Sequence, residues 1–391
     1  MPNANLTAAM RAKNDEFYTQ YADIEKEINA YLEYDADVFR GKTILLPCDD
    51  PEWSNFPKFF AQNFEKFGLK KLISTSFAED SKTHGFGSQP SLLELGDPRY
   101  DERKTKIKGK IFTLDKDKNR DGKIDVNDLK WKYLSGDGDF RSPEIMKLRD
   151  EADIIITNPP FSLFRDFLGW IVEANKQFSI IGNMNSITYK DVFPLLKENK
   201  MWLGPTISSG DREFQVPDTY PIDAASWRVD EKGRKFLRIK GVRWFTNIDH
   251  GRRHQPMELM TMAENRKFSK KLEGTSAYEN YDNYDAMEIP FADAIPSNYD
   301  GVMGVPISFL DKYSPEQFEI LGSEKDNTLK TKVYPRQLQI DKNGKTSNVT
   351  KLNDGAALKV LNRPEDATCY LVDGEYFVQA YKRVFIKHRK L

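Results

Sequence analysis

The chain has 391 residues, a formal net charge of −1, 39% hydrophobic residues and 12% aromatic residues. This length predicts two domains, or one large domain with a substantial appendage, and the aromatic content excludes a disordered chain. The near-zero charge does not by itself indicate a polyanionic partner, although a local basic face is enough to contact phosphates.

The sequence also bears on compartment. No run approaches the roughly 18 apolar residues of a membrane span, and residues 1–17 lack the apolar core of a signal peptide. Cys48 and Cys369 lie far apart without CxxC spacing, which argues against a disulfide scaffold and a zinc site. We therefore expect a globular protein of the cytoplasm with no membrane partner.

The first part of the chain alternates predicted helices and strands. Residues 16–33 carry apolar side chains at spacings of three and four, as in an amphipathic helix. Residues 42–50 predict a buried strand that ends at two aspartates, residues 54–67 a helix and residues 70–77 a second strand. Gly, Pro, Lys and Asp then interrupt the alternation over residues 81–135, which indicates an insertion or long loops with one or two short strands.

Alternation resumes at residue 143, with predicted helices over residues 143–152 and 163–176 and a strand over residues 177–184. Alternating strands and helices favour an α/β fold with a mostly parallel sheet covered on both faces. Beyond about residue 205 the predicted elements are shorter, more strand-like and rich in aromatic residues. The sequence therefore predicts a first domain over residues 1–204 and a mixed α+β region over residues 205–391.

The motif with the clearest chemistry follows an apolar strand, Ile154 to Thr157, which leads directly into Asn158, Pro159, Pro160 and Phe161. This places the four residues at the carboxyl end of a strand, where open α/β sheets bind ligands. Because consecutive prolines end the strand, the Pro159 carbonyl becomes an acceptor outside any regular hydrogen-bond ladder.

Two acceptors at this position suit methylation of an exocyclic adenine amine. Such an amine is a weak nucleophile because its lone pair is delocalised into the ring. Asn158 Oδ1 and the Pro159 carbonyl can accept its two hydrogens and favour the pyramidal form that attacks a methyl group. Phe161 offers a face on which an extruded base can stack. We therefore predict that Asn158, Pro159, Pro160 and Phe161 form a catalytic centre; the alternative is a rigid turn without chemistry.

Residues 117–128 follow the spacing of a calcium-binding loop, with glycine at position six. An Asp instead of Glu at position twelve and a strand-like preceding segment depart from that pattern. A structural Ca²⁺ ion and a solvated acidic, lysine-rich hairpin are both open interpretations. The predicted ligands are Asp117, Asn119, Asp121, the Lys123 carbonyl, Asp125 and Asp128.

Several sequence blocks resemble, in order, those of the N6-adenine DNA methyltransferases, and within them the EcoRI-type modification methylases. The blocks are NDEFYTQYADIE, CDDPEWSNF, GLKKLI, GDGDFRSPE, IITNPPFSLFRDFL, IIGNMNSITYKDVF, YDNYDAMEI, NYDGVMGVPISFL and SPEQFEILG. Together they span most of the chain and are specific to the EcoRI type, whereas NPPF alone marks amino-methyltransferases in general.

The resemblance implies a Rossmann-like methyltransferase fold that binds S-adenosylmethionine, with target recognition in the later part of the chain. It implies methylation of adenine N6 in double-stranded DNA by base flipping, either by a solitary enzyme or beside a restriction endonuclease that acts on the same site. The alternatives are an amine methyltransferase acting on RNA or on a protein glutamine, and a nucleic-acid binding protein without chemistry, which the intact Asn158 disfavours.

The resemblance also indicates cofactor contacts. Most such enzymes carry glycines after the first strand, and this chain has Pro47, Cys48, Asp49 and Asp50 there; the carboxylates suit the cationic methionine end or the ribose, or else cap a helix. The other predicted cofactor contacts are Phe17, Tyr18 and Thr19 beside the methionine moiety, Asp139 and Phe140 beside the adenine, and Asn158. Their alternatives are a core aromatic pair and a polar turn.

Basic residues of the later region are candidates for DNA contact. Arginine reads guanine bidentately and binds phosphate. The predicted contacts are Arg243, Arg252, Arg253 and His254, and solvated surface charge is the alternative for each.

Overall fold

The computed structural model describes residues 18–51, 54–78, 97–207, 211–216, 227–275, 277–325 and 329–389. The chain forms two compact units. The first unit comprises Met1–Ser186 and Met201–Gly251, and the second comprises Ile187–Lys200 and Arg252–Leu391. The boundary predicted at residue 204 falls within the first unit.

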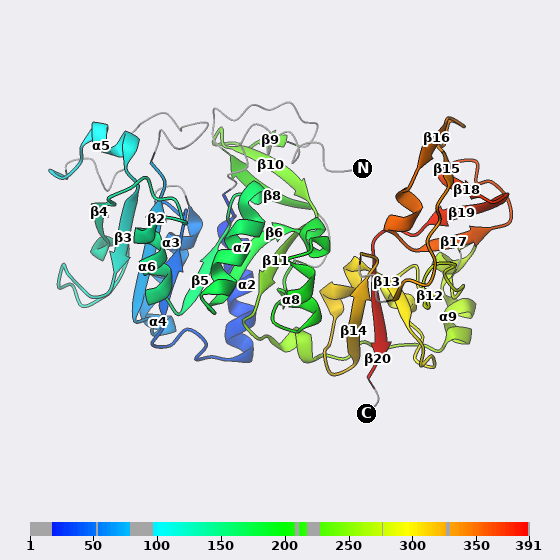
Figure 1. Ribbon diagram of the computed structural model, residues 1–391. Helices are drawn as coiled ribbons and strands as arrows, with labels where there is room; N and C mark the ends of the chain where they lie inside the picture. Colours follow the sequence, from blue (N-terminus) through cyan, green and yellow to red (C-terminus); the bar gives the residue numbers. More distant parts are fainter. Residues whose placement is uncertain are drawn as a thin grey trace. The chain divides into compact units, whose positions relative to one another are not determined.

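A large sheet forms the centre of the first unit (Figure 1). Its strands are β1 (Thr43–Leu46), β2 (Lys71–Ser76), β3 (Lys110–Leu114), β4 (Lys130–Tyr133), β5 (Ile154–Thr157), β6 (Gln177–Asn183), β7 (Trp202–Leu203) and β11 (Val242–Thr246). They lie in the order β4-β3-β2-β1-β5-β6-β11-β7. The central strands β2, β1, β5 and β6 are parallel, whereas β3, β4, β11 and β7 each run antiparallel to their neighbours. The predicted parallel sheet is therefore confirmed at its centre, and the flanking strands make the whole sheet mixed.

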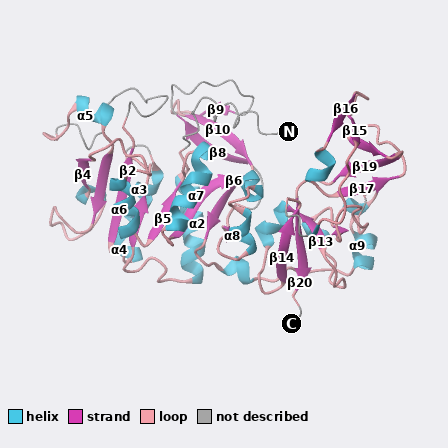
Figure 2. Cartoon of the chain, in the orientation of Figure 1, coloured by secondary structure: helices cyan, strands magenta, loops and turns pink. Residues whose placement is uncertain are grey.

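Helices cover both faces of this sheet (Figure 2). They are α2 (Tyr21–Tyr34), α3 (Asn55–Gln62), α4 (Phe64–Phe67), α6 (Pro143–Glu151) and α7 (Phe164–Glu173), and α5 (Glu102–Ile107) lies beyond the sheet. Successive strand residues point to opposite faces, so Ile44 and Ile154 join the core cluster with Ile28 of α2. On the other face, Phe164 of α7 packs against Phe245 at 4.9 Å between ring centroids. The central strands β1 and β5 are thus buried on both sides.

A small antiparallel sheet completes the first unit. It consists of β8 (Asp211–Val216), β9 (Trp227–Val229) and β10 (Lys235–Lys240) in the order β8-β10-β9. Phe214 and Leu237 turn into the same core cluster as α2 and α3. Tyr18 forms an isolated bridge with Gln215, which fixes the start of the described chain against this sheet.

The second unit contains two sheets and short helices. The helices are α8 (Phe193–Lys197) and α9 (Met262–Phe268). One sheet has the order β12-β13-β20-β14, formed by β12 (Met287–Glu288), β13 (Met303–Pro306), β14 (Phe318–Ser323) and β20 (Arg383–His388). The other is antiparallel with the order β16-β15-β18-β19-β17, formed by β15 (Gln337–Ile340), β16 (Thr346–Val349), β17 (Ala357–Val360), β18 (Cys369–Val372) and β19 (Glu375–Gln379).

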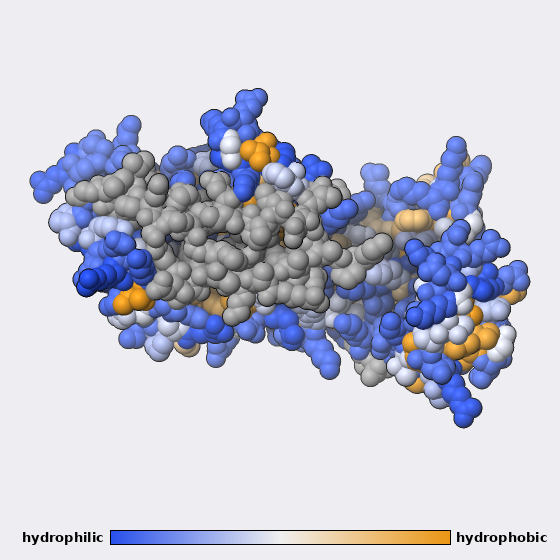
Figure 3. Space-filling view, turned by 90° about the horizontal axis from the view of Figure 1, so that it is seen from above, coloured by the Kyte–Doolittle hydropathy of each residue, from blue (hydrophilic) through white to orange (hydrophobic). Residues whose placement is uncertain are grey.

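The surface seen in Figure 3 is mostly hydrophilic among the described residues, and its apolar atoms form small separate groups. The exposed large hydrophobic residues include Ile107, Trp227, Phe268, Val333 and Leu361, which come from distant parts of the sequence. Dispersed apolar side chains of this kind are ordinary on a protein surface. Among the helices that the structure describes, none has the length and hydropathy needed to span a bilayer.

Candidate active site

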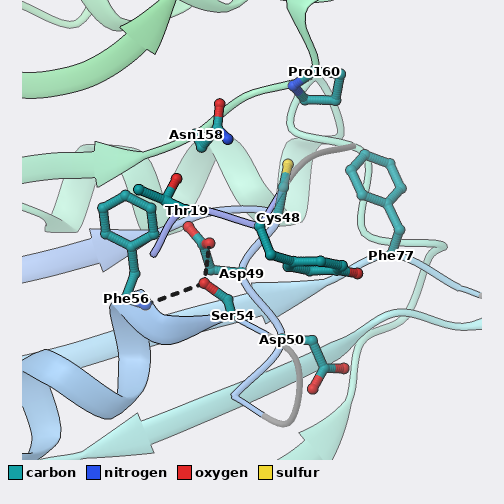
Figure 4. A pocket seen from close by; sticks show the side chains of 10 residues that line it. Thr19, Cys48, Asp49, Asp50, Ser54, Phe56, Phe77, Asn158 and Pro160 are labelled. Carbon is teal, nitrogen blue, oxygen red and sulfur yellow. Dashed lines mark hydrogen bonds between the residues drawn. The ribbon is translucent and has the colours of Figure 1, made fainter. Parts of the chain in front are cut away.

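A pocket lies where the central parallel strands end at their carboxyl edge (Figure 4). It joins residues that follow β1, β2 and β5 with the start of the described chain. Its lining residues are Tyr18, Thr19, Cys48, Asp49, Asp50, Ser54, Phe56, Phe77, Asn158 and Pro160. The fold therefore brings Asn158 and Pro160 of the predicted catalytic motif together with most of the predicted cofactor residues.

The catalytic motif leaves the sheet at the end of β5. Thr157 is the last strand residue, and Asn158 and Pro160 are half-buried in the pocket wall. The Leu163 amide donates to the Pro160 carbonyl at 2.9 Å, which begins the turn into α7. The Phe161 ring is only 7% exposed and meets the Phe214 ring edge-on at 6.4 Å. Stacking of a base on Phe161 therefore stays a prediction.

The loop after β1 obtains its shape without glycine. Cys48 has φ of 68°, the left-handed region that glycine usually occupies. Hydrogen bonds to β2 hold this turn: Cys48 N donates to Thr75 Oγ1 at 3.4 Å, and the Ser74 hydroxyl donates to the Asp49 carbonyl. Neighbouring strands therefore provide the constraint that compensates for the missing glycines.

Asp49 is buried beneath this loop. Ser54 Oγ donates to its Oδ1 at 2.6 Å, and Thr157 Oγ1 lies 2.6 Å from its Oδ2. Burial raises the pKa of Asp49 to about 7. Thr157 Oγ1 also lies 2.8 Å from the Pro47 carbonyl oxygen. The loop and the catalytic strand are thus connected through one carboxyl group.

The segment before α2 forms another wall of the pocket. Tyr18 pairs with Gln215 through backbone hydrogen bonds of 3.0 and 3.1 Å, and Asn55 Nδ2 donates to the Thr19 carbonyl at 2.8 Å. The Thr19 hydroxyl is buried in the pocket wall and has no hydrogen-bond partner within the described part of the chain. Buried polar groups normally have a partner, so this hydroxyl fits a polar ligand. The predicted contact Phe17 lies outside the described residues.

Three of the predicted cofactor residues that the structure describes, Pro47, Asp139 and Phe140, do not line this pocket. The Asp139 carboxylate pairs with Arg141 at 2.6 Å, and the hydrogen bond from Arg141 lowers the pKa of Asp139. Phe140 is buried and packs edge-on against Phe167 and Trp170. A cofactor contact through Asp139 and Phe140 stays a prediction.

The calcium-like loop uses its oxygen atoms internally. Asp117 accepts from the amides of Arg120 and Gly122 at 2.6 and 2.9 Å. Asp128 accepts amide hydrogens from Lys118 at 2.7 Å and from Asp125 at 3.1 Å. Among the residues that the structure describes, no group of three or more His, Cys, Asp or Glu side chains is arranged to hold a metal. The predicted Ca²⁺ ion is therefore not supported.

None of the predicted DNA-contact residues is among the residues that line this pocket. Arg243 belongs to β11 of the first unit, is 5% exposed, and donates to the Val242 carbonyl. Arg253 is 7% exposed and donates to Asn199 Oδ1. His254 Nδ1 lies 2.6 Å from Glu316 Oε1, and Arg252 is half-exposed. The burial of Arg243 and Arg253 gives both a structural role here, and DNA contact by these four residues stays a prediction.

Three lining residues did not emerge from sequence reasoning. Phe77 follows β2, and its place at the carboxyl end of a predicted strand is the signal that it offered. Ser54 caps α3 by accepting from the Phe56 amide at 3.2 Å, so a helix-capping signal was present in the sequence. For Phe56, the sequence indicated only a core residue of the predicted helix.

Comparisons with known proteins agree on the family. The family model described as adenine-specific methyltransferase EcoRI matches residues 5–389. Type II methyltransferase M.EcoRI of Escherichia coli is 41% identical over 323 residues, which cover 83% of this chain and 90% of that protein. Type II methyltransferase M.MpnI of Mycoplasma pneumoniae is 33% identical over 335 residues, which cover 84% and 90%. No solved structure matches this chain. The chain belongs to the EcoRI family of adenine-specific methyltransferases.

Proposed function

We propose that this protein is a site-specific DNA methyltransferase that transfers a methyl group from S-adenosylmethionine to N6 of an adenine turned out of double-stranded DNA. The observation that carries the proposal is that Asn158 and Pro160 share one pocket with Thr19, Asp49 and Asp50 at the carboxyl end of parallel strands. This arrangement supports a Rossmann-like fold in which the cofactor binds beside the end of β1 and the target base binds beside the end of β5.

The chain's own residues fit a cationic cofactor. S-adenosylmethionine supplies an electrophilic methyl group on a sulfonium sulfur. The half-buried Asp50 carboxylate and the buried Thr19 hydroxyl would bind polar or cationic groups, and the Phe77 ring would cover an apolar face. Asp49, buried beneath the loop after β1, would hold that loop against the catalytic strand.

Asn158 and Pro159 would act on the adenine amine. Asn158 Oδ1 and the Pro159 carbonyl would accept the two amine hydrogens, which localises the lone pair on nitrogen. As the nitrogen–carbon bond forms, the carbon–sulfur bond breaks and its electron pair stays on sulfur. The methylated amine then releases one proton to solvent. Phe161 would stack on the extruded base after a rearrangement that exposes its ring.

The second unit, which includes Arg252 and His254, would carry target recognition. Tyr381 is 69% exposed between β19 and β20 and is followed by Lys382. An exposed aromatic ring beside lysines suits contact with bases and phosphates. A restriction endonuclease acting on the same site would be the functional partner, and cytoplasmic DNA the substrate.

The decisive experiment is incubation of the purified protein with unmethylated genomic DNA and labelled S-adenosylmethionine, followed by sequencing that reads N6-methyladenine. We expect label in DNA, confined to one sequence motif. Label in RNA or protein with none in DNA would instead identify an amine methyltransferase of another substrate class. Asn158→Ala provides the inactive control.

A further inference from the structure

Hydrogen atoms around Thr157 can be counted from the oxygen positions. Thr157 Oγ1 lies 2.8 Å from the Pro47 carbonyl oxygen and 2.6 Å from Asp49 Oδ2. A carbonyl oxygen only accepts, and a threonine hydroxyl has one hydrogen to donate. If the carboxyl were ionised, it would also only accept, so the single hydroxyl hydrogen would have to be shared between these two short contacts or leave one of them without a hydrogen.

The other oxygen of the carboxyl does not supply the missing hydrogen. Ser54 Oγ accepts from the Phe56 amide at 3.2 Å and gives its own hydrogen to Asp49 Oδ1 at 2.6 Å. A hydrogen on Asp49 Oδ2 gives each of the two contacts of Thr157 a hydrogen of its own, with the carboxyl group donating to Thr157 Oγ1. The resulting chain runs from Asp49 to the Thr157 hydroxyl, and from that hydroxyl to the Pro47 carbonyl.

We propose that Asp49 is a neutral carboxylic acid that positions the active site, donating to Thr157 and joining the cofactor loop to the strand that carries Asn158. The proton assignment depends only on the oxygen positions. The positioning role also rests on the proposed function, because it assumes that Asn158 holds the target amine. In this role Asp49 touches neither the cofactor nor the base.

The surroundings favour the neutral form. The side chain is buried, and burial disfavours the charged form of a carboxyl group. The other titratable groups of the pocket are Asp50, the Cys48 thiol and the Tyr18 phenol, and the negative charge of Asp50 acts in the same direction as burial. The groups that contact the Asp49 carboxyl from α3 and β5 are the hydroxyls of Ser54 and Thr157. The described lining of the pocket contains no cation.

Infrared spectroscopy of the protein without cofactor tests the proton assignment. A protonated carboxyl has a carbonyl stretch separate from that of a carboxylate. Burial also raises the pKa of Glu324 to about 7, and labelling aspartate with ¹³C distinguishes the Asp49 band from a glutamate band. We expect a label-sensitive band below pH about 7 that is absent in Asp49→Asn and retained in Asp50→Asn. Absence of this band in the folded wild-type protein at pH about 5 would overturn the proposal.

Matched variants test positioning. Asparagine reproduces the neutral acid, since its amide donates to Thr157 and its carbonyl accepts from Ser54, whereas leucine has similar volume and does neither. We expect calorimetry to show at least about tenfold weaker S-adenosylmethionine binding in Asp49→Leu and recovery of most of that loss in Asp49→Asn. Equal losses in the two folded variants would refute positioning by a neutral acid. Failure to methylate DNA while the infrared band is present would refute the proposed function alone.

Discussion

At the scale of single residues, the proposed mechanism assigns to Asn158 a hydrogen-bonding role that an apolar side chain cannot fill. Asn158 follows the last residue of β5 directly, so its position is set by the strand, and the two prolines that follow limit its backbone freedom. A preorganised acceptor of this kind acts mainly on the transition state, because developing positive charge on the amine strengthens its hydrogen bonds.

Replacing Asn158 by alanine should therefore separate binding from turnover. We expect Asn158→Ala to bind S-adenosylmethionine with nearly unchanged affinity and to lose about 100-fold or more of the single-turnover methylation rate. Calorimetry and rapid-quench kinetics on a DNA duplex with one recognition site measure the two quantities. Full turnover by this variant would remove Asn158 from the mechanism.

Asp49 predicts a particular pH dependence of stability. Its pKa is raised from 3.8 to about 7 in the folded protein, so between these values the folded state binds more protons than the unfolded state. Its stabilising contribution is complete below pH about 4 and is lost as the pH rises to about 7, with a slope of at most about 1.4 kcal/mol per pH unit. Urea unfolding of wild type and Asp49→Asn should give a difference with this slope. A pH-independent difference would contradict the shifted pKa.

At the scale of elements, the loop of residues 136–139 packs closely against the end of β2. The Ala78 amide donates to the Asp137 carbonyl at 2.8 Å. Gly138 has φ of 92°, and a Cβ there would overlap the Ser76 carbonyl oxygen. Gly136, in the same loop, has no atom within 4 Å of such a Cβ. The two glycines therefore have different structural importance.

This difference gives a matched pair of variants. Gly138→Ala should lower the free energy of unfolding by about 1 to 3 kcal/mol, since the left-handed backbone and the backbone overlap both oppose a side chain. Gly136→Ala should change it by less than about 0.5 kcal/mol. Denaturant unfolding measures both, and equal effects would show that the loop does not approach β2 as described.

Sequence reasoning recovered the elements whose signals are local. Residues 42–50, 70–77 and 177–184 were predicted as strands and form β1, β2 and β6, because long apolar runs between turn residues leave few alternatives. The antiparallel pairing of β11 with β6 was not predicted, since it depends on contacts between segments about 60 residues apart in sequence.

In the candidate site, too, residues with a local sequence signal were predicted and contacts between distant segments were not. Asn158 was predicted from its motif and Asp50 from the family resemblance, and both line the pocket. The roles of Thr157 and Ser54 beside Asp49 follow from hydrogen bonds between β5, the loop and α3, which no spacing in the sequence encodes. The calcium-like spacing of residues 117–128 failed to indicate a metal group for a related reason: the same pattern of short acidic side chains also satisfies backbone amides in a turn.

At the scale of the whole molecule, a net charge of −1 means that attraction to DNA must come from local groups. In the second unit, burial lowers the pKa of Lys382 and the neighbouring ammonium of Lys325 lowers it further, whereas the nearby Glu324 acts in the opposite direction. Two ammonium groups that repel one another form a favourable place for a phosphate, whose charge would stabilise both protonated forms.

Lys382 should therefore contribute to DNA affinity mainly through phosphate contact. We expect Lys382→Ala to weaken binding to cognate and unrelated duplexes by similar factors, and to reduce the slope of log K against log salt concentration by about one. Lys382→Arg should keep the slope. Lys359→Ala is the matched control, because Lys359 is exposed in the same unit and pairs with Glu375 at 2.5 Å. Fluorescence anisotropy across a salt series measures these slopes; an unchanged slope in Lys382→Ala, or an equal decrease in Lys359→Ala, would place the phosphate contact elsewhere on the protein.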